Sequence, residues 1–302
     1  MVGITTTAVI LYSDAVAREI DVSSTIAMAP QHAFFEENYT QPAKTIVFFK
    51  THKTASTSLH CIMCRYGYTN QLSLIFSRYN NINGHLRNTI PNPSWFLPPI
   101  RNTSNSAGKY NILTGHVTYY RSLIGSFMEG IPKYITILRE PAAQIESHMN
   151  FFNLRKRVMK DIKLFTKDPF KFENGGKAAS RNNQISDLGL KRSKTSNEAT
   201  INATILKLDK EFDLVLIAEY FDESLLLLKR ILRWSFDDIL YLVKNQRMHR
   251  ETITHEFRQQ IYQWSRADVL LYQYFNETLW RRVQQYGPQF EDDLVYFGAL
   301  PS

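Results

Sequence analysis

Four short apolar segments constrain the fold of this chain more than any other feature. They are "TIVFFK", "YNILTGH", "YITILRE" and "DLVLI", and each is followed by a stretch of helical or turn character. Strands that alternate with helices at short spacing, without an internal repeat, indicate a parallel sheet. We therefore expect an α/β fold, a parallel sheet flanked by helices, over residues 44–290. Residues 1–43 are expected to lie outside this core, and 291–302 to form a C-terminal tail.

The first strand leads into a polar loop, "KTHKTASTS" at 50–58, which combines two lysines and a histidine with several hydroxyls. A loop between a strand and a helix N-terminus directs backbone N–H groups and the positive end of the helix dipole at one point, which favours phosphate. Lysines add charge there, and threonine and serine hydroxyls add donors. The glycines of the ATP-binding loop are absent. The segment is thus either a phosphate loop of another kind or an ordinary polar turn with solvated lysines.

The helix after this loop is expected to have Ser56 or Thr57 as its N-cap and to end near Gly67. It carries the two cysteines of the chain, Cys61 and Cys64. Their spacing fits two small buried helix positions, and a C-x-x-C redox site is the alternative. No cluster in the sequence resembles a zinc site.

Polar groups stand at the ends of three predicted strands: the loop 50–58, Gly115-His116 and Arg139. In parallel sheets, ligands bind beyond the carboxyl ends of the strands. These groups are therefore expected to converge on one crevice. Pro141 suits the first turn of a helix that follows Arg139.

The net charge of +8 and the isoelectric point near 9.3 suit an anionic ligand, an acidic polymer or a membrane surface. Residues 80–109 are expected to form a surface excursion, and the basic segment 155–180 a flap or a loop that faces an acceptor. Sequons at Asn38, Asn102, Asn202 and Asn276 favour the secretory pathway mildly. The apolar run "ITTTAVILY" is too short to span a bilayer.

Two of these segments resemble the nucleotide sites of sulfotransferases that use 3′-phosphoadenosine-5′-phosphosulfate (PAPS). "KTHKTASTS" is similar to their 5′-phosphosulfate loop, and "LREPAAQIESH" to their 3′-phosphate site. "DLGL", "LVLIAEYFDESLLLLKRIL" and "YLVKNQR" resemble the galactose-3-O-sulfotransferases in particular, and the similarity runs from about residue 44 to 285. The resemblance implies a P-loop-like sulfotransferase fold and an enzyme that transfers a sulfuryl group from PAPS to the 3-hydroxyl of galactose. It implies a galactose-terminated glycolipid, such as galactosylceramide, or another glycan as acceptor.

The resemblance also assigns roles to residues. Lys53 would neutralise the bridging oxygen of the departing phosphate, and Arg139 with Ser147 would hold the 3′-phosphate. The expected nucleotide-binding residues are Lys50, Thr51, Lys53, Thr54, Ala55, Ser56, Thr57, Ser58, Arg139 and Ser147. No metal and no nucleic acid is expected. The alternatives are a helix-start ion pair for Arg139 and a packing role for Ser147.

The general base is expected to be His116, at a strand end and behind a glycine that admits a sugar. His52, in the phosphate loop, is the rival. Asn183 and Asp187 are expected either to touch acceptor or nucleotide or to form a turn. His60, His148 and His249 are assigned structural roles.

Two other functions remain open from the residues alone: a nucleotide-dependent kinase, which would need a glycine-rich loop, and a non-catalytic heparin- or glycan-binding module that uses the basic 155–194 stretch. The acceptor itself also remains open between a glycolipid, a glycoprotein galactose and a glycosaminoglycan. The resemblance implies a type II protein of the Golgi lumen with a membrane anchor, although this chain shows no such segment. The sequence predicts no particular oligomeric state.

Overall fold

The computed structural model describes residues 41–77, 92–99, 108–151, 181–242 and 254–300 of the chain. All of them belong to one compact unit, His32–Ser302. The predicted basic segment 155–180, the sequons at Asn38 and Asn102, and His249 lie outside the described residues.

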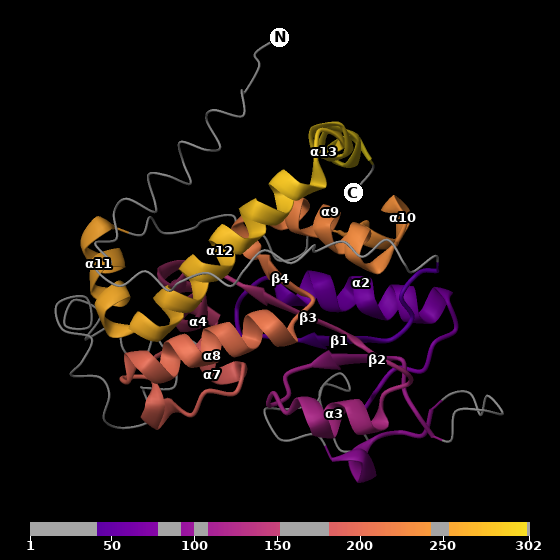
Figure 1. The fold of residues 1–302 in the computed structure, drawn as a ribbon, viewed down its shortest axis with the longest axis horizontal. Coiled ribbons are helices and arrows are strands. Elements are labelled where there is room, and N and C mark those ends of the chain that lie inside the picture. Colours follow the sequence, from indigo (N-terminus) through magenta and orange to yellow (C-terminus); the bar gives the residue numbers. More distant parts are fainter. Residues whose placement is uncertain (1–40, 78–91, 100–107, 152–180, 243–253, 301–302) are drawn as a thin grey trace. The chain divides into compact units, whose positions relative to one another are not determined.

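A four-stranded parallel sheet forms the centre of this unit (Figure 1). Its strands are β1 (Ile46–Phe49), β2 (Ile112–Gly115), β3 (Lys133–Leu138) and β4 (Leu214–Ile217), in the order β2-β1-β3-β4. Every neighbouring pair is parallel, so the four carboxyl ends lie at the same edge. The predicted α/β class and all four predicted strands are confirmed.

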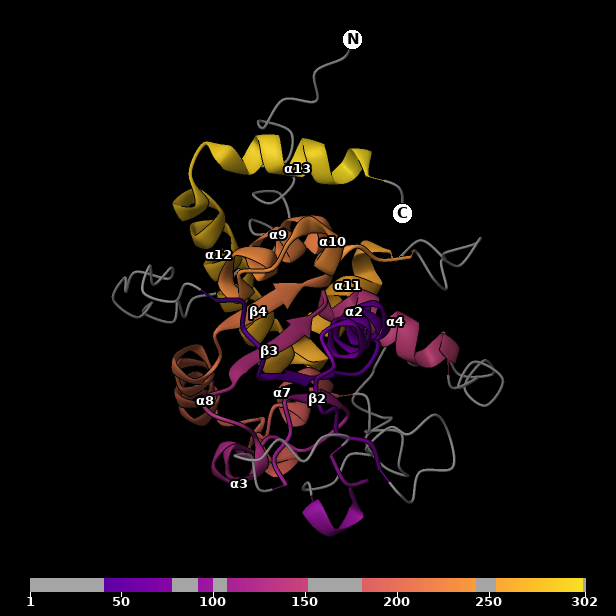
Figure 2. The same ribbon diagram turned by 90° about the vertical axis from the view of Figure 1, so that its right-hand side faces the viewer.

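Helices cover both faces of the sheet, which explains why the strands are largely apolar. In Figure 2, α2 and α4 lie on one side of the sheet and α8 on the other. The helices that follow strands are α2 (Ser56–Thr69), α3 (Arg121–Phe127), α4 (Pro141–Phe151) and α9 (Phe221–Leu232). The others are α7 (Asn183–Asp187), α8 (Glu198–Glu211), α10 (Phe236–Ile239), α11 (His255–Trp264), α12 (Arg266–Tyr286) and α13 (Gln289–Ala299). Short 3₁₀ turns occupy Pro93–Trp95, Arg192–Lys194 and Ala218–Tyr220.

Three local expectations about α2 are corrected by the structure. Its N-cap is Ala55, in the left-handed conformation, and Ser56 donates its hydroxyl to the Thr51 carbonyl instead of capping the helix. The helix ends at Thr69, near the expected position, but Gly67 lies within its last turn and does not stop it: a Cβ there would lie 2.7 Å from Leu74 Cδ1, so glycine permits close packing. Cys61 is exposed, because the buried face of α2 is set by residues such as Leu59, Ile62 and Met63.

Two regions expected at the periphery contribute buried aromatic side chains. Phe96 lies within the predicted excursion 80–109, yet it is buried against Tyr110 and Phe127. The C-terminal residues form α13, whose Phe290 and Phe297 are buried. Aromatic burial and an antiparallel backbone bridge between Ser77 and Phe96 thus attach the first of these regions to the core.

Candidate active site

The site lies where the chain reverses its direction of winding across the sheet. From β1 the chain passes to β2 at one side, and β3 then pairs with the other side of β1. Such a switch point opens a crevice beyond the carboxyl ends of the strands. The residues that follow the strands there are Lys50 after β1, His116 after β2 and Arg139 after β3. The ends of β1 and β2 are joined directly, because Lys50 N donates to Gly115 O at 3.1 Å and His116 Nδ1 lies 2.9 Å from Lys50 O.

The loop between β1 and α2 has an unusual backbone. Lys53 and Ala55 have φ angles of 62° and 60°, in the left-handed region that non-glycine residues seldom adopt. Alternation between left- and right-handed residues turns successive N–H groups toward one point and creates an anion-binding concavity. Strain of this kind concentrates at functional sites. The loop thereby has the curvature that glycines provide in the ATP-binding version.

Hydroxyls inside the loop hold this conformation. Thr51 and Thr54 are fully buried, and their Oγ1 atoms lie 2.8 Å apart. Thr51 Oγ1 also donates to Ile137 O on β3, and Ser56 Oγ donates to Thr51 O at 2.9 Å. These three side chains therefore brace the loop against the sheet. Thr57 is exposed and Ser58 half-buried, so these two hydroxyls are better placed for a ligand.

The cations of the site sit in different environments. Lys50 is buried, with 7% of its surface exposed, and this burial lowers the pKa of its ammonium group while the Cys61 and Cys64 thiols oppose the shift. Lys53 is half-buried, and its carbonyl accepts a bond from Arg139 Nη1 at 3.2 Å. The two predicted phosphate-binding segments, 86 residues apart, are thus in direct contact.

Arg139 is fixed by backbone and side-chain contacts. The Gln184 side chain bonds to both backbone polar groups of Arg139: its Oε1 accepts from Arg139 N and its Nε2 donates to Arg139 O, both at 2.8 Å. Arg139 Nε lies 3.8 Å from Glu219 Oε1. Burial, followed by the neighbouring Glu140 carboxylate, raises the pKa of Glu219 to about 7, against the opposing effect of Arg139.

Two neighbouring residues of α4 are also buried, Ser147 and His148. Burial, followed by repulsion from nearby His52, Lys53 and Arg192, lowers the pKa of His148 to about 4. His148 therefore stays neutral at physiological pH and lies within electrostatic range of the loop. Sequence reasoning had given it only a structural role.

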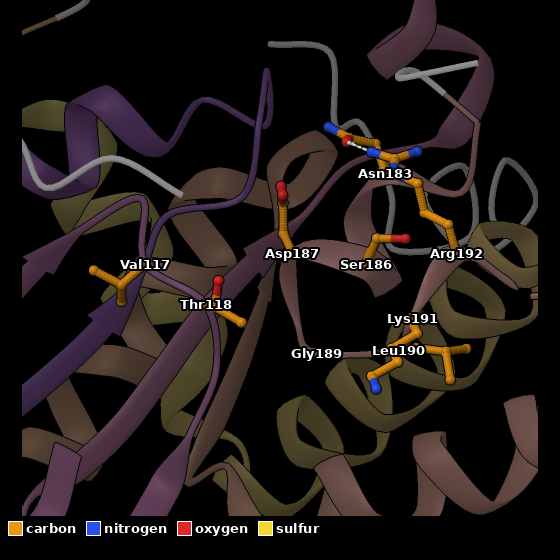
Figure 3. Close-up of a pocket in the computed structure, with 9 residues that line it drawn as sticks. All are labelled: Val117, Thr118, Asn183, Ser186, Asp187, Gly189, Leu190, Lys191 and Arg192. Atoms are coloured by element: carbon orange, nitrogen blue, oxygen red, sulfur yellow. Dashed lines mark hydrogen bonds between the residues drawn. The ribbon is translucent and has the colours of Figure 1, made fainter. Parts of the chain in front are cut away.

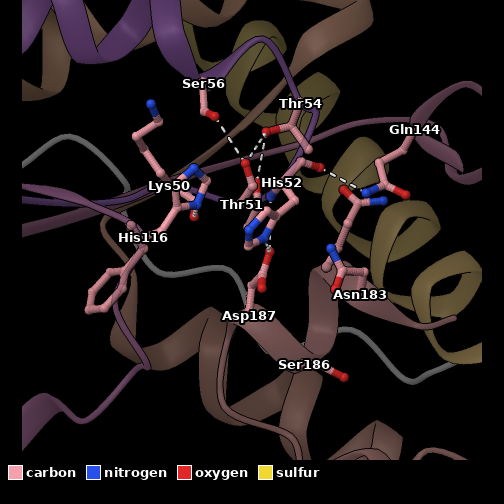
Figure 4. A network of polar contacts seen from close by, with 12 residues as sticks. Lys50, Thr51, His52, Thr54, Ser56, His116, Gln144, Asn183, Ser186 and Asp187 are labelled. Atoms are coloured by element: carbon pink, nitrogen blue, oxygen red, sulfur yellow. Dashed lines mark hydrogen bonds and ion pairs between the residues drawn. The ribbon is translucent and has the colours of Figure 1, made fainter. Parts of the chain in front are cut away.

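The two candidate bases meet in one cluster with Asp187 (Figure 4). The rings of His52 and His116 stack with centroids 4.2 Å apart. Asp187 Oδ2 accepts from His52 N at 2.9 Å and lies 2.8 Å from His52 Nδ1. When Nδ1 donates to the carboxylate, Nε2 is left as the basic nitrogen. The sequence left open whether Asp187 belongs only to a turn. In the structure, Asp187 lies at the end of helix α7 and binds His52.

Helix α7 owes its position to reciprocal capping with α12. Asn182 Oδ1 accepts from Ala267 N and Asp268 N at 3.0 and 3.2 Å, at the start of α12. In return, the Asp268 carboxylate accepts from Ile185 N and Gln184 N at 2.8 and 3.1 Å, at the start of α7. Each short side chain satisfies donors that a helix start leaves without partners. This exchange fixes Asp187 opposite His52.

Several residues of the site were missed by sequence reasoning. They are Gln144, Gln184, His148, Glu219 and Asp268. Gln144 is fully buried and donates to His52 O at 2.8 Å, while its Oε1 has no hydrogen-bond donor among the described residues. A polar residue at a buried helix position was the available signal, because such side chains are kept where they hold a partner.

A pocket of about 290 Å³ opens beside this cluster (Figure 3). Val117 and Thr118 line one side, and residues between 183 and 192 line the other. Asp187, which holds His52, is part of its wall. The pocket therefore borders the histidine pair.

Within the described ranges, no group of three or more His, Cys, Asp or Glu side chains is arranged to hold a metal ion. The same residues include no helix long and apolar enough to cross a bilayer.

Comparisons with known proteins identify the family of the chain. The sequence profile of the galactose-3-O-sulfotransferases matches residues 1–294. Mouse (Mus musculus) galactosylceramide sulfotransferase is 32% identical over 258 residues, which cover 82% of this chain and 59% of the mouse protein. The human (Homo sapiens) galactosylceramide sulfotransferase is 33% identical over 260 residues, with the same coverage. Human galactose-3-O-sulfotransferase 2 is 30% identical over 258 residues, covering 82% of this chain and 63% of that protein. The chain thus spans about six tenths of the length of these relatives, and the profile match shows that it belongs to the galactose-3-O-sulfotransferase family.

Proposed function

We propose that this protein transfers a sulfuryl group from PAPS to the 3-hydroxyl of a galactose residue, on a glycolipid such as galactosylceramide. The observation that carries the proposal is the contact between the strained loop 50–58 and Arg139 at the switch point of the sheet. Membership of the galactose-3-O-sulfotransferase family and the names of the mouse and human relatives support the reaction and the acceptor.

The residues present fit such a donor. A concave loop with left-handed Lys53 and Ala55, a buried ammonium at Lys50 and the guanidinium of Arg139 provide cationic and N–H groups for two separate phosphates. Lys50, Lys53, Thr57 and Ser58 would hold the 5′-side. Arg139 would hold the 3′-phosphate, with Ser147 as a further donor. PAPS supplies a sulfuryl group already activated as a phosphosulfate anhydride, and no metal is needed for this role.

The geometry favours His52 as the general base, although the sequence pointed first to His116. A carboxylate hydrogen-bonded to Nδ1 stabilises the imidazolium that forms when Nε2 takes a proton. His52 has this partner in Asp187, whereas His116 Nδ1 is bonded to a backbone carbonyl. In the reaction, His52 Nε2 takes the proton of the galactose 3-hydroxyl as its oxygen bonds to sulfur. Lys53 stabilises the charge that develops on the bridging oxygen as the sulfur–oxygen bond breaks.

The acceptor is proposed to be a glycolipid, and the similarity to galactose-3-O-sulfotransferase 2 leaves a second candidate, another galactose-terminated glycan. We place the protein in the Golgi lumen, where it associates with the membrane. The proposed acceptor and the proposed location both rest on membership of the galactose-3-O-sulfotransferase family.

Donor binding can be tested with ligands alone. Adenosine 3′,5′-bisphosphate should raise the melting temperature, and ATP with magnesium should raise it less. At a ligand concentration of about 100 times Kd, a stabilisation of about 2.7 kcal/mol is expected. Stabilisation by ATP with magnesium alone would point to a kinase, and stabilisation by neither to a non-catalytic glycan-binding module.

The reaction is tested with labelled PAPS and a panel of acceptors: galactosylceramide, lactosylceramide, a galactose-terminated glycoprotein glycan and a glycosaminoglycan. Galactosylceramide should be the best acceptor, and linkage analysis of its product should place sulfate at the 3-position. Sulfate at the 6-position, or on an amino sugar, would refute the proposed reaction. A better rate on the glycoprotein glycan would replace the glycolipid by the second candidate.

A further inference from the structure

The pocket of Figure 3 is separate from the residues assigned to the nucleotide. It lies between the segment after β2, which supplies Val117 and Thr118, and the segment from α7 to Arg192. Its volume of about 290 Å³ is at the lower end of the range for small-molecule sites. That size suits a single sugar ring rather than an extended glycan.

One carboxylate faces both this pocket and the histidine pair. Asp187 Oδ2 accepts from His52 N and lies 2.8 Å from His52 Nδ1. Asp187 Oδ1 has no hydrogen-bond donor among the described residues, although a carboxylate oxygen accepts two. The side chain of Asp187 is 12% exposed and forms part of the pocket wall, so this spare acceptor capacity is available to a ligand there.

The other groups of the wall suit a neutral ligand with hydroxyls. Thr118 presents a hydroxyl that bonds to none of the described residues. Ser186 Oγ donates to Asn182 O at 2.7 Å and keeps its acceptor capacity. Val117 and Leu190 add apolar surface for the C–H groups of a ring.

The charges of the pocket are mixed, because Lys191 and Arg192 are cationic and Asp187 carries a carboxylate. Arg192 directs Nη1 to Arg181 O and Nη2 to Asn183 Oδ1, at 2.7 and 2.8 Å, so these contacts direct much of its guanidinium to the protein itself. Asp187 would repel an anion that entered beside it. A hydroxyl is the ligand group that a carboxylate acceptor binds without this penalty.

We propose that this pocket binds the acceptor galactose and that Asp187 joins the acceptor to the base. Its Oδ2 orients His52, while its Oδ1 accepts a hydrogen bond from a hydroxyl beside the one that is sulfated. The proposal rests on the proposed function and deepens it. Because one rigid carboxylate holds both partners, a galactose bound to Oδ1 brings its neighbouring 3-hydroxyl to His52. Proximity of this kind is a large part of enzymatic rate enhancement.

Filling the pocket tests its role without changing Asp187. Thr118→Trp adds bulk from the opposite wall, and Tyr120→Trp, at an exposed position two residues on, is the matched control. Thr118→Trp should raise KM for a soluble galactoside about tenfold or more, as expected for lost acceptor binding. Affinity for adenosine 3′,5′-bisphosphate, measured by calorimetry, should stay at the wild-type value in both variants. An unchanged galactoside KM in Thr118→Trp would overturn the pocket assignment.

Acceptors that lack one hydroxyl test the role of Asp187 Oδ1. Wild type and Asp187→Asn are compared on a galactoside and on its 2-deoxy and 4-deoxy analogues, with the exposed Asp237→Asn on α10 as control. One analogue should lose about 10- to 100-fold in kcat/KM with wild type, the effect of one hydrogen bond to a charged group. The same analogue should lose much less with Asp187→Asn, because the amide oxygen stays with the two His52 donors and the Nδ2 group that replaces Oδ1 cannot accept the bond.

The outcomes separate this inference from the proposed function. The contrary result is that each analogue loses the same factor in kcat/KM with Asp187→Asn as it does with wild type. That result would show that Asp187 acts only on His52, and it would overturn the bridging role. If the bisphosphate did not bind wild type at all, the proposed function itself would fail. If wild type bound the bisphosphate and Thr118→Trp kept the wild-type KM for the galactoside, only the assignment of the acceptor pocket would be refuted.

Discussion

At the scale of single residues, function depends on which side chains the strand ends bring together. Arg139 contacts the Lys53 carbonyl, and Gln184 bonds to both the backbone N–H and the backbone carbonyl of Arg139. His52 and His116 stack on each other, but only His52 has a carboxylate at Nδ1. These contacts support two predictions about individual side chains.

Arg139→Ala should weaken binding of adenosine 3′,5′-bisphosphate. The loss of a charge-assisted contact costs about 1.5–3 kcal/mol, which is a decrease of about 10- to 100-fold in affinity. Calorimetry measures this, with the exposed Lys210→Ala on α8 as a control for general charge. Unchanged affinity in Arg139→Ala would show that the 3′-phosphate binds elsewhere.

His52→Ala should reduce turnover about 10²- to 10⁴-fold, because the general base is lost. Bisphosphate affinity, measured in parallel, should persist. His116→Ala is the matched comparison, since it removes the ring stacked on His52 but leaves the His52–Asp187 contact. Near-normal turnover in His52→Ala together with an inactive, nucleotide-binding His116→Ala would give the role of base to His116.

At the scale of elements, the site depends on how the five-residue helix α7 is attached to α12. A helix this short has little stability of its own. Its start is capped by Asp268, a residue of α12 that is 1% exposed, while Asn182 caps α12 in return. Disturbing this exchange should release Asp187 from its place opposite His52.

Asp268→Ala should therefore destabilise the protein and also lower its activity. Two backbone donors lose their acceptor in a buried site, which costs about 1–3 kcal/mol for each donor left unsatisfied, before relaxation. Urea unfolding measures the stability change, and the exposed Asp237→Ala on α10 is the control. Turnover should fall further than bisphosphate affinity, because α7 carries Asp187 and the nucleotide loop belongs to β1–α2. Wild-type stability in Asp268→Ala would contradict the capping role.

At the scale of the whole molecule, two carboxyls with raised pKa values link folding to pH: Asp268, which is 1% exposed, and Glu219, whose side chain is 31% exposed. Burial raises the pKa of Asp268 to about 7, against the backbone donors of Ile185 and Gln184. Burial and Glu140 raise the pKa of Glu219 to a similar value. In the unfolded chain both groups ionise near their ordinary values, 3.8 and 4.5. Between those values and about 7, the folded protein binds more protons than the unfolded chain.

Stability should accordingly decrease as the pH rises from about 4.5 to about 7, as far as these two groups determine it. Their full contribution is present below the unfolded pKa values and is lost as pH passes the folded ones. Urea unfolding at a series of pH values measures the slope. Glu219→Gln removes one of the two groups and should make the slope shallower, while the exposed Glu198→Gln should not. An identical slope in Glu219→Gln would mean that this carboxyl is ionised in the folded protein at neutral pH.

The sequence by itself determined the strands, the helices that follow them and the position of the phosphate loop. Each of these depends on local patterns: apolar runs, a polar loop before a helix, and Pro141 at the start of α4. It placed Lys53, His52, His116 and Arg139 at strand ends, and parallel pairing brought those ends to one edge. Local patterning failed at Gly67 and Cys61, whose surroundings depend on Leu74, Ile112 and the packed face of α2.

Only the tertiary structure decided which of these residues act together. His52 and Asp187 are 135 positions apart, and Arg139 and Lys53 are 86 apart. Their contacts depend on the strand order β2-β1-β3-β4 and on the reciprocal capping of α7 and α12. Hydrophobic periodicity repeats over a few residues, so it specifies which face of an element is buried but not which distant element covers it. Packing of the whole core decides which distant element covers each face. That arrangement in turn sets the partner of each polar side chain.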